Sequence, residues 1–284
     1  IPVTVLIGSI RDKKRLDEVF ETYHPTVVFH AAAHKHVPLM EISPAEAVKN
    51  NVLGTKNLLT SASEHDVERF VQLSTDKAVN PTSVMGCTKR ICEMLIQTFA
   101  GNTDMKCVAV RFGNVLGSHG SVIPLFEAQI KKGGPVTLTD PNIERYFMTI
   151  PEAAQLVLQA GALAESGNIY VLDMGEPVKI MDLAKQLIRF YGYEPGVNME
   201  IKIVGLRPGE KLYEELMMDE EQGKMRRTEH NKIFVASPRD IDLAVFYQQL
   251  QDLAAAAQHN DEGVVDQLEK MIPTFTPTRK NLKV

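Results

Sequence analysis

The stretch Phe70-Val71-Gln72-Leu73-Ser74-Thr75-Asp76-Lys77-Ala78 joins a short apolar run to a hydroxyl, a carboxylate and an amine. Ser83-Val84-Met85-Gly86-Cys87-Thr88-Lys89 follows it and enters an amphipathic segment. This order predicts a strand, a turn and a helix. Because side chains at the carboxyl end of such a strand converge on a crevice, we expect chemistry at Asp76 and Lys77. An isolated Asp-Lys pair would be a solvated turn, so the surrounding sequence has to decide.

The first half of the chain alternates strand-like and helix-like stretches. We expect strands at 3–7, 26–33, 67–73 and 105–112, and helices at 13–23, 44–63 and 88–99. Strands that alternate with helices indicate a parallel sheet with helices on both faces. The predicted fold class is therefore α/β, with a Rossmann-like doubly wound parallel sheet.

The second half is interrupted more often by glycine and proline, which indicates shorter elements and more turns. We expect helices at 152–164, 180–191 and 241–258, and strands at 168–173 and 200–204. These patterns divide the chain into a Rossmann-like domain, 1–117, and a smaller subdomain, 118–284, from which segments can return to the sheet. The tail from Pro273 is expected to be loosely held.

The composition describes an ordinary globular chain. Its 284 residues are 44% hydrophobic and 24% charged, and the formal net charge is -5. This charge argues against a general nucleic-acid binder but allows a local pocket for small anions. No apolar run approaches the roughly 18 residues that a membrane-spanning helix needs.

Cysteine and histidine give no sign of a metal site. Cys87, Cys92 and Cys107 lack paired ligand spacing, so we interpret them as reduced core residues. The cluster His34-Lys35-His36 has no third ligand at a suitable spacing, and we interpret it as a loop beside the ligand site.

Seven segments in order carry a resemblance to a known family. They are Ala31-Ala32-Ala33-His34-Lys35-His36-Val37-Pro38, Asn50-Asn51-Val52-Leu53-Gly54-Thr55, Ser74 to Ala78, Met85 to Lys89, Arg111-Phe112-Gly113-Asn114-Val115, Arg145-Tyr146-Phe147-Met148-Thr149 and Gly205-Leu206-Arg207-Pro208-Gly209-Glu210-Lys211. Together they resemble the extended short-chain dehydrogenase/reductase family, and within it the UDP-N-acetylglucosamine 4,6-dehydratases of polysaccharide biosynthesis. The resemblance implies NAD as cofactor and a UDP-sugar as substrate.

Met85 departs from the usual pattern of this family, in which a tyrosine stands four residues before the lysine. A thioether has no proton to exchange, so residue 85 cannot be the base. One interpretation is an inactive site. The sequence is, however, similar to a membrane-anchored, long-chain branch that has methionine here and remains active, and we favour that branch.

The resemblance implies catalytic roles for Thr75, Asp76, Lys77, Met85 and Lys89. By this resemblance Lys77 would be the base at carbon 5 of the sugar and Asp76 the acid for the departing hydroxyl. The hydroxyl of Thr75 can relay a proton from the carbon 4 hydroxyl to water or an amine, so we expect Thr75 to be an orienter and relay. Lys77 must then be partly neutral, through burial or a neighbouring cation such as Lys89, whereas Asp76 must be protonated in an apolar site.

The resemblance also implies the binding residues. Cofactor contacts are expected from Ser9, Ile10, Ala31, Ala32, Ala33, Asn51 and Lys89, and substrate contacts from His36, Asn114, Arg145, Arg207 and Glu210. Two arginines suit a diphosphate, because each can donate paired hydrogen bonds to its oxygens.

The segment Leu6-Ile7-Gly8-Ser9-Ile10 resembles the third strand of the family and its exit, and no glycine-rich phosphate turn precedes it. We expect the chain to be part of a longer protein that supplies this turn and a membrane anchor before it, which would make the chain a cytoplasmic domain. A homo-oligomer is also expected. Two alternatives stay open: a nucleotide-sugar 4-epimerase, and a non-catalytic module that binds nucleotide sugars or partner proteins.

Overall fold

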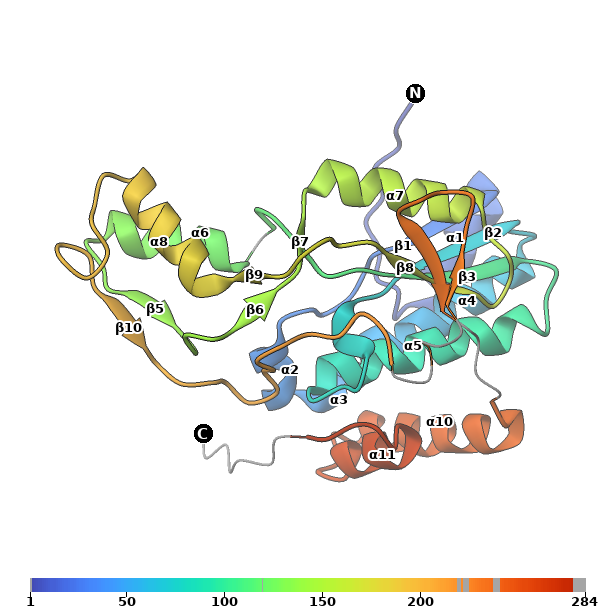
Figure 1. Ribbon diagram of the computed structural model, residues 1–284. Coiled ribbons are helices and arrows are strands. Elements are labelled where there is room, and N and C mark those ends of the chain that lie inside the picture. Colours follow the sequence, from blue (N-terminus) through green and yellow to red (C-terminus); the bar gives the residue numbers. More distant parts are fainter. Residues whose placement is uncertain (1, 119, 219–220, 222–224, 237–240, 278–284) are drawn as a thin grey trace.

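The computed structural model describes residues 2–118, 120–218, 221, 225–236 and 241–277. Its main sheet has six strands in the order β1-β2-β3-β8-β12-β11 (Figure 1). They are β1 Val27–His30, β2 Arg69–Leu73, β3 Lys106–Arg111, β8 Ile169–Leu172, β12 Ile233–Ala236 and β11 Arg226–Arg227. The first four strands are parallel, and β12 and β11 are antiparallel to their neighbours. The α/β, Rossmann-like prediction is therefore confirmed, with an antiparallel edge.

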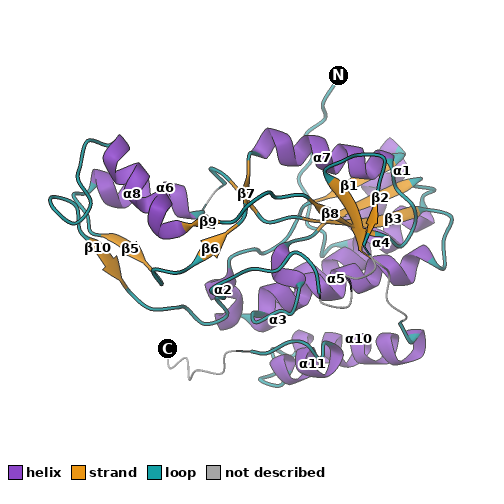
Figure 2. Cartoon of the chain, viewed as in Figure 1, coloured by secondary structure: helices purple, strands orange, loops and turns teal. Residues whose placement is uncertain are grey.

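Alternate side chains of the strands supply two separate cores. On one face, Val71 and Val108 pack against α7 Ile150–Ala162. On the other, Phe70 and Cys107 belong to the cluster that includes α5 Val84–Ala100. Helices thus cover both faces of the sheet (Figure 2), as the burial of successive residues in its central strands requires.

The helix expected at 44–63 forms, but in three joined pieces. These are α3 Pro44–Ala47, the π-helical turn η1 Val48–Leu53 and α4 Gly54–Glu64. The expected helix at 13–23 is α1 Lys13–Tyr23, with Asp12 accepting a hydrogen bond from the Arg15 amide as its N-cap. A short helix that the sequence did not suggest, α2 Val37–Ile42, follows the His34-Lys35-His36 loop.

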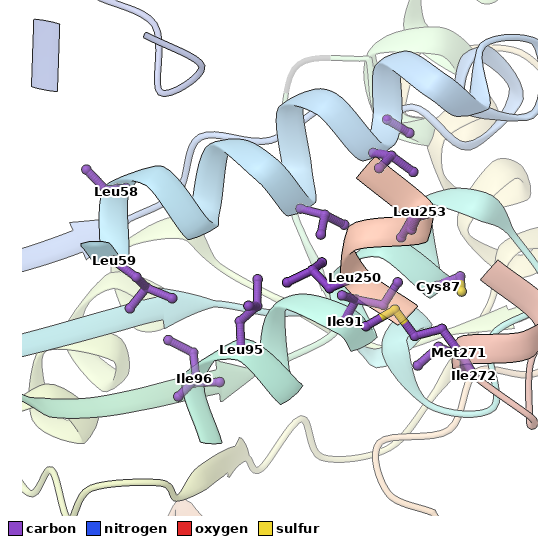
Figure 3. Packing of buried hydrophobic residues seen from close by; sticks show 14 of the residues in the cluster. Leu58, Leu59, Cys87, Ile91, Leu95, Ile96, Leu250, Leu253, Met271 and Ile272 are labelled. Atoms are coloured by element: carbon purple, nitrogen blue, oxygen red, sulfur yellow. The ribbon is translucent and has the colours of Figure 1, made fainter. Parts of the chain in front are cut away.

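Two helices from the end of the chain form an additional layer beneath α5. These are α10 Leu243–Gln258 and α11 Val264–Met271, and they share a core with α5 through residues such as Leu250, Leu253 and Met271 (Figure 3). The prediction of a loose tail from Pro273 is wrong as far as the described chain reaches. Phe275 is buried in this core, and the Thr276 amide donates to the Pro81 carbonyl at 3.0 Å.

The strand expected at 3–7 is wrong. The segment has no regular secondary structure and pairs with no strand of the described chain, and Val3, Val5 and Ile7 are 82%, 84% and 87% exposed. A strand needs a partner for its backbone groups, and β1 pairs only with β2 within the described residues.

A smaller lobe lies beyond the carboxyl ends of the parallel strands (Figure 1). It contains α6 Val122–Lys131, β5 Val136–Leu138, α8 Ile180–Phe190 and β10 Ile201–Ile203, around a core that includes Phe126, Ile188 and Met199. Short strands connect it to the sheet: β4 Asn114–Val115, β6 Glu144–Arg145, β7 Phe147–Met148 and β9 Val178–Lys179. Residues after 117 thus build this lobe and also return to the sheet as β8, β11 and β12.

No helix within the described residues is long and apolar enough to cross a membrane. All three cysteines are buried and unpaired, which confirms their interpretation as core residues.

Candidate active site

A cavity of about 480 Å³ lies between the carboxyl end of the sheet and the smaller lobe. It is lined by the loop after β1, the ends of β2 and β3, α5 and several elements of the lobe. A different hollow of about 430 Å³ lies at the amino ends of β2 and β3, around Arg69 and Lys106. Because ligands of open α/β sheets bind at the carboxyl ends of the strands, the first cavity is the candidate site.

The turn after β2 holds Thr75, Asp76 and Lys77 in one hydrogen-bonded group. The Asp76 amide donates to the Phe112 carbonyl at 3.0 Å, which ties the turn to the end of β3. Thr75 Oγ1 donates to Asp76 Oδ1 at 2.8 Å, and Lys77 Nζ donates to the same oxygen at 3.0 Å. The carboxylate thus connects the hydroxyl to the amine, and Thr75 and Lys77 both line the cavity.

Asp76 lies behind the cavity wall with its side chain fully buried. Its Oδ2 atom is buried and has no hydrogen-bond partner within the described residues. A buried carboxylate oxygen without a donor is one position at which a carboxylic proton could be held.

Lys77 is surrounded by acceptors. Besides Asp76, its Nζ atom donates to Asn114 Oδ1 at 3.3 Å and lies 3.5 Å from Glu214 Oε1. Burial lowers the pKa of Lys77, but the carboxylates of Asp76 and Glu214 outweigh it, so the pKa is raised overall. The expectation of a partly neutral Lys77 is therefore wrong for the ligand-free site, because its acidic neighbours hold the amine in its charged form.

Lys89 has the opposite character. It lies on α5, is buried, and its Nζ atom donates to the Leu73 carbonyl. Burial lowers its pKa, against smaller opposing effects of Cys92 and Glu93. Met85 stands one helical turn before Lys89, lines the same cavity and is 5% exposed.

All five predicted substrate residues line the cavity, but they differ in how far other groups of the protein already engage them. Asn114 Nδ2 donates to the Tyr146 carbonyl at 3.3 Å, and Glu210 Oε2 accepts from the Arg207 amide at 3.1 Å. The Arg207 side chain is exposed and has no ion-pair partner within the described residues. His36, at the start of α2, is also exposed.

Arg145 lines the cavity but is already engaged with the backbone. Its Nη1 atom donates to the carbonyls of Glu144 at 2.7 Å and Leu212 at 3.1 Å, and Nη2 donates to Lys211 at 2.8 Å. These bonds clamp the segment after Glu210 onto β6. Little of the guanidinium is left to bind a diphosphate.

The predicted cofactor residues are only partly brought together. Ala31, Ala33 and Lys89 line the cavity, whereas Ser9, Ile10, Ala32 and Asn51 do not. The buried Asn51 instead receives the His34 amide at 2.7 Å and donates to the Thr88 hydroxyl at 3.0 Å. It therefore fixes the loop after β1 onto α5. Within the described residues, no group of three or more His, Cys, Asp or Glu side chains could hold a metal ion.

Sequence reasoning missed two groups that support the site. Glu214 follows the predicted segment Gly205 to Lys211 by three residues, but nothing in the sequence says that it is buried while Glu215 is exposed. The second group is centred on Glu93, which accepts from Ser74 Oγ at 2.7 Å and from Arg111 at 2.8 and 3.0 Å.

The turn Thr75-Asp76-Lys77 is called the functional turn below. The Glu93 group anchors Ser74, the residue before this turn, inside the core. Arg90 also donates to Glu93 at 2.7 Å, and Arg111 donates to Glu221 at 2.8 Å. Burial raises the pKa of Glu93, but the two guanidinium groups outweigh it and lower the pKa to about 2. The ionised carboxylate is thus well paired, as a buried charge must be.

Comparisons with known proteins agree with the fold. The family model described as "polysaccharide biosynthesis protein" matches residues 1–238. The capsular polysaccharide biosynthesis protein CapD of Staphylococcus aureus is 61% identical in a match that covers 75% of this chain and 35% of CapD. A protein named UDP-glucose 4-epimerase from Rickettsia canadensis is 35% identical over 98% of this chain and 82% of its own length.

Solved structures show the same architecture. The X-ray structure of Pen from Bacillus thuringiensis has a TM-score of 0.75 and 37% identity, covering 82% of this chain and 71% of that chain. DesIV, a dTDP-glucose 4,6-dehydratase from Streptomyces venezuelae with NAD bound, has a TM-score of 0.69 at 20% identity, covering 90% and 81%. The latter likeness concerns the fold alone. With most of its length matched by the family model, the chain belongs to the polysaccharide biosynthesis protein family, within the extended short-chain dehydrogenases/reductases.

Proposed function

We propose that this chain is the catalytic domain of a sugar-nucleotide 4,6-dehydratase that acts on UDP-N-acetylglucosamine. The observation that carries the proposal is the group formed by Thr75, Asp76 and Lys77 at the cavity, where Asp76 Oδ1 accepts from both neighbours at 2.8 and 3.0 Å. It combines an acid, a base and a relay at one end of the sheet. The chain spans about a third of the length of its Staphylococcus relative, so the activity of the whole protein is part of the proposal.

The cavity suits a nicotinamide on the side of Lys89. Ala31 and Ala33 line the cavity with small side chains, and Lys89 supplies an amine one helical turn after Met85. We therefore propose NAD as the cofactor and Ala31, Ala33 and Lys89 as its contacts in this cavity. Held by these residues, the cofactor would supply reversible hydride transfer, for oxidation at carbon 4 of the sugar and reduction at carbon 6.

The chain's own residues would carry the elimination. Lys77 as a neutral amine would remove the proton from carbon 5, so that a C–H bond breaks and an N–H bond forms. Asp76 would give its proton to the hydroxyl on carbon 6, which leaves as water. Thr75, hydrogen-bonded to Asp76, would orient the hydroxyl on carbon 4 and relay its proton to water when carbon 4 is oxidised. Lys77 would return its proton to carbon 5 as the hydride returns to carbon 6, and Asp76 would regain a proton from water. Met85 has no proton to exchange, so it would only shape the wall.

The test is incubation of the chain with UDP-N-acetylglucosamine and NAD, followed by mass spectrometry of the sugar nucleotide. We expect a loss of about 18 mass units, one water, in line with acid–base elimination. Asp76→Asn and Lys77→Ala should abolish it, while the exposed controls Asp252→Asn and Lys132→Ala should not. Near-normal turnover in either site variant would refute the assigned pair.

A second candidate is a nucleotide-sugar 4-epimerase, which the Rickettsia relative's name favours. Epimerisation leaves the mass unchanged, so a product of equal mass that differs chromatographically from the substrate would select it. The third candidate is a binding module, which would bind the nucleotide sugar without product. A homo-oligomer and a membrane anchor in a longer protein stay predictions.

A further inference from the structure

Glu214 is a buried carboxylate between two cations of the site. The residue is 8% exposed. Its Oε1 atom lies 3.5 Å from Lys77 Nζ and 3.7 Å from Arg145 Nε. Its Oε2 atom is buried and has no hydrogen-bond partner within the described residues. One carboxylate oxygen thus faces the amine, and the other is unoccupied.

The position of Glu214 is fixed by the backbone that carries it. Arg145 donates to the carbonyls of Lys211 and Leu212, and the Leu212 carbonyl also receives the Glu144 amide at 3.1 Å. Lys211 Nζ donates to the Val79 carbonyl at 3.0 Å, just after the functional turn. Glu214 is thus held against Lys77 by contacts on both sides.

Lys77 has to lose a proton before it can act as a base. The groups that face it are Asp76, Glu214 and Asn114, and the nearby cations are Arg145 and Lys211. Asp76 is the acid in the proposed reaction and gives its proton to the leaving hydroxyl, so it is not the store for the proton of Lys77. Asn114 is an amide and is not a proton acceptor at ordinary pH. Only Glu214 remains among these neighbours.

We propose that Glu214 is a positioning residue that takes the proton of Lys77 when a sugar nucleotide fills the cavity. The inference rests on the proposed dehydratase function. An N–H bond of Lys77 breaks and an O–H bond forms on Glu214, so the net charge of the pair is zero before and after the transfer. A bound sugar excludes water from the amine, and exclusion of water disfavours the ion pair relative to the neutral pair.

The properties of Glu214 suit this role. Burial raises its pKa, with Asp76 adding to the effect, while Lys77, Arg145 and Lys211 act in the other direction; the net pKa is raised. A carboxylate with a raised pKa is the better acceptor for a proton from a neighbouring amine. Besides burial, the groups that shift the pKa of Lys77 most are Asp76, Glu214 and Arg145, and Lys89 on α5 is not one of them.

The transfer predicts a distinctive pH profile. The wild-type pair keeps one shared proton over a wide range, so turnover should be nearly independent of pH around neutrality. In Glu214→Gln, Lys77 must lose its proton to solvent instead. Turnover should then fall at neutral pH and rise about tenfold with each added pH unit until Lys77 is deprotonated.

The first experiment is the turnover of UDP-N-acetylglucosamine as a function of pH in the wild type, Glu214→Gln and Glu215→Gln. The last variant is the matched control, because Glu215 is the adjacent exposed glutamate and pairs with Lys211 at 3.1 Å. It should keep the wild-type profile. A Glu214→Gln profile parallel to that of the wild type would overturn the inference, since a purely structural role would only scale the rate.

A second measurement separates this inference from the proposed function. The protein is labelled with ¹³Cε-lysine, the Lys77 resonance is assigned with Lys77→Ala, and its titration midpoint is measured. Loss of a facing carboxylate should lower the midpoint by about one pH unit or more in Glu214→Gln, and an unchanged midpoint would overturn the inference. If the midpoint is lowered in Glu214→Gln while the wild-type protein dehydrates no UDP-N-acetylglucosamine, the proposed function is refuted and the Lys77–Glu214 pair is still supported.

Discussion

The carbonyl oxygen of Lys77 lies directly against Gly86, so that a Cβ atom on residue 86 would be 2.1 Å from it. The turn that carries Lys77 is thereby packed onto the first turn of α5. This helix carries Met85 and, one turn later, Lys89. The Ser83 hydroxyl accepts the Gly86 amide at 3.1 Å and caps the helix at this point. The glycine is required by the close approach of two backbones, not by an unusual φ angle.

Gly86→Ala should displace the functional turn. We expect a loss of about 1–3 kcal/mol in the free energy of unfolding, from overpacking, and a fall of about a hundredfold or more in turnover, because a displacement of about 1 Å misaligns reacting groups. Urea denaturation and the mass-spectrometric assay measure the two effects. Gly101→Ala is the control, because no atom lies within 4 Å of its added Cβ and its φ is −83°. Wild-type turnover in Gly86→Ala would show that the turn does not position the chemistry.

Met85→Leu should preserve turnover within a few fold. The side chain lines the cavity but has no proton to give or accept, and a Met-to-Leu change nearly conserves volume, at a cost below about 1.5 kcal/mol. The measurement is kcat and KM for the sugar nucleotide at one pH. A loss of kcat as large as that of Lys77→Ala would mean that the thioether contributes to the reaction, contrary to the assignment.

Much of the fold could be predicted because its signals are local. The apolar run Phe70–Leu73 and the helix signal of 88–99 each lie inside one element, and the alternation along the chain predicts a parallel sheet with helices on both faces. The strand at 3–7 was predicted wrongly because β-branched residues favour a strand only where a partner strand is present. Strand pairing is a tertiary property that composition does not contain. The π-helical turn around Asn51 had no sequence signal of its own.

The site could be predicted where its residues lie in the seven segments that carry the family resemblance. Thr75, Lys77, Met85 and Lys89 do converge on one cavity. The charge state of Lys77 was not predictable, because it depends on Glu214, which is 137 residues away in the sequence and whose burial no local pattern reveals. For the same reason, the sequence could not show that Arg145 is engaged with backbone carbonyls, whereas Arg207 is free of ion pairs within the described residues.

His30 should make the folded state sensitive to mild acid. It is buried and its Nε2 atom lies 2.9 Å from Thr55 Oγ1. Burial, with a contribution from Lys89, lowers its pKa from 6.5 to about 3. Between these values the unfolded chain binds a proton that the folded chain does not, so stability falls as the pH drops below about 6.5, by about 1.4 kcal/mol per pH unit.

The His30 contribution can be isolated with His30→Gln, which cannot be protonated and can still hydrogen-bond Thr55. Urea unfolding is measured for both proteins near neutrality and at about pH 5. Relative to its value near neutrality, the wild type should lose about 2 kcal/mol more than the variant. An equal loss in both proteins would show that His30 titrates with its ordinary pKa.

Arg145 and Arg207 should respond to truncation in opposite ways, although both line the cavity. Arg145→Ala removes the donors of three backbone carbonyls and leaves the buried Glu214 with one cation fewer, so it should cost about 2–4 kcal/mol of unfolding free energy. Arg207→Ala removes an exposed guanidinium and should change stability by less than about 0.5 kcal/mol. Its loss should instead raise KM for the sugar nucleotide about tenfold to a hundredfold, the value of a charged hydrogen bond to phosphate. Urea denaturation curves of the two variants measure the change in stability, and steady-state kinetics measure the change in KM. An Arg145→Ala protein with wild-type stability and a raised KM would assign the diphosphate to Arg145 and remove the clamp role argued from its carbonyl contacts.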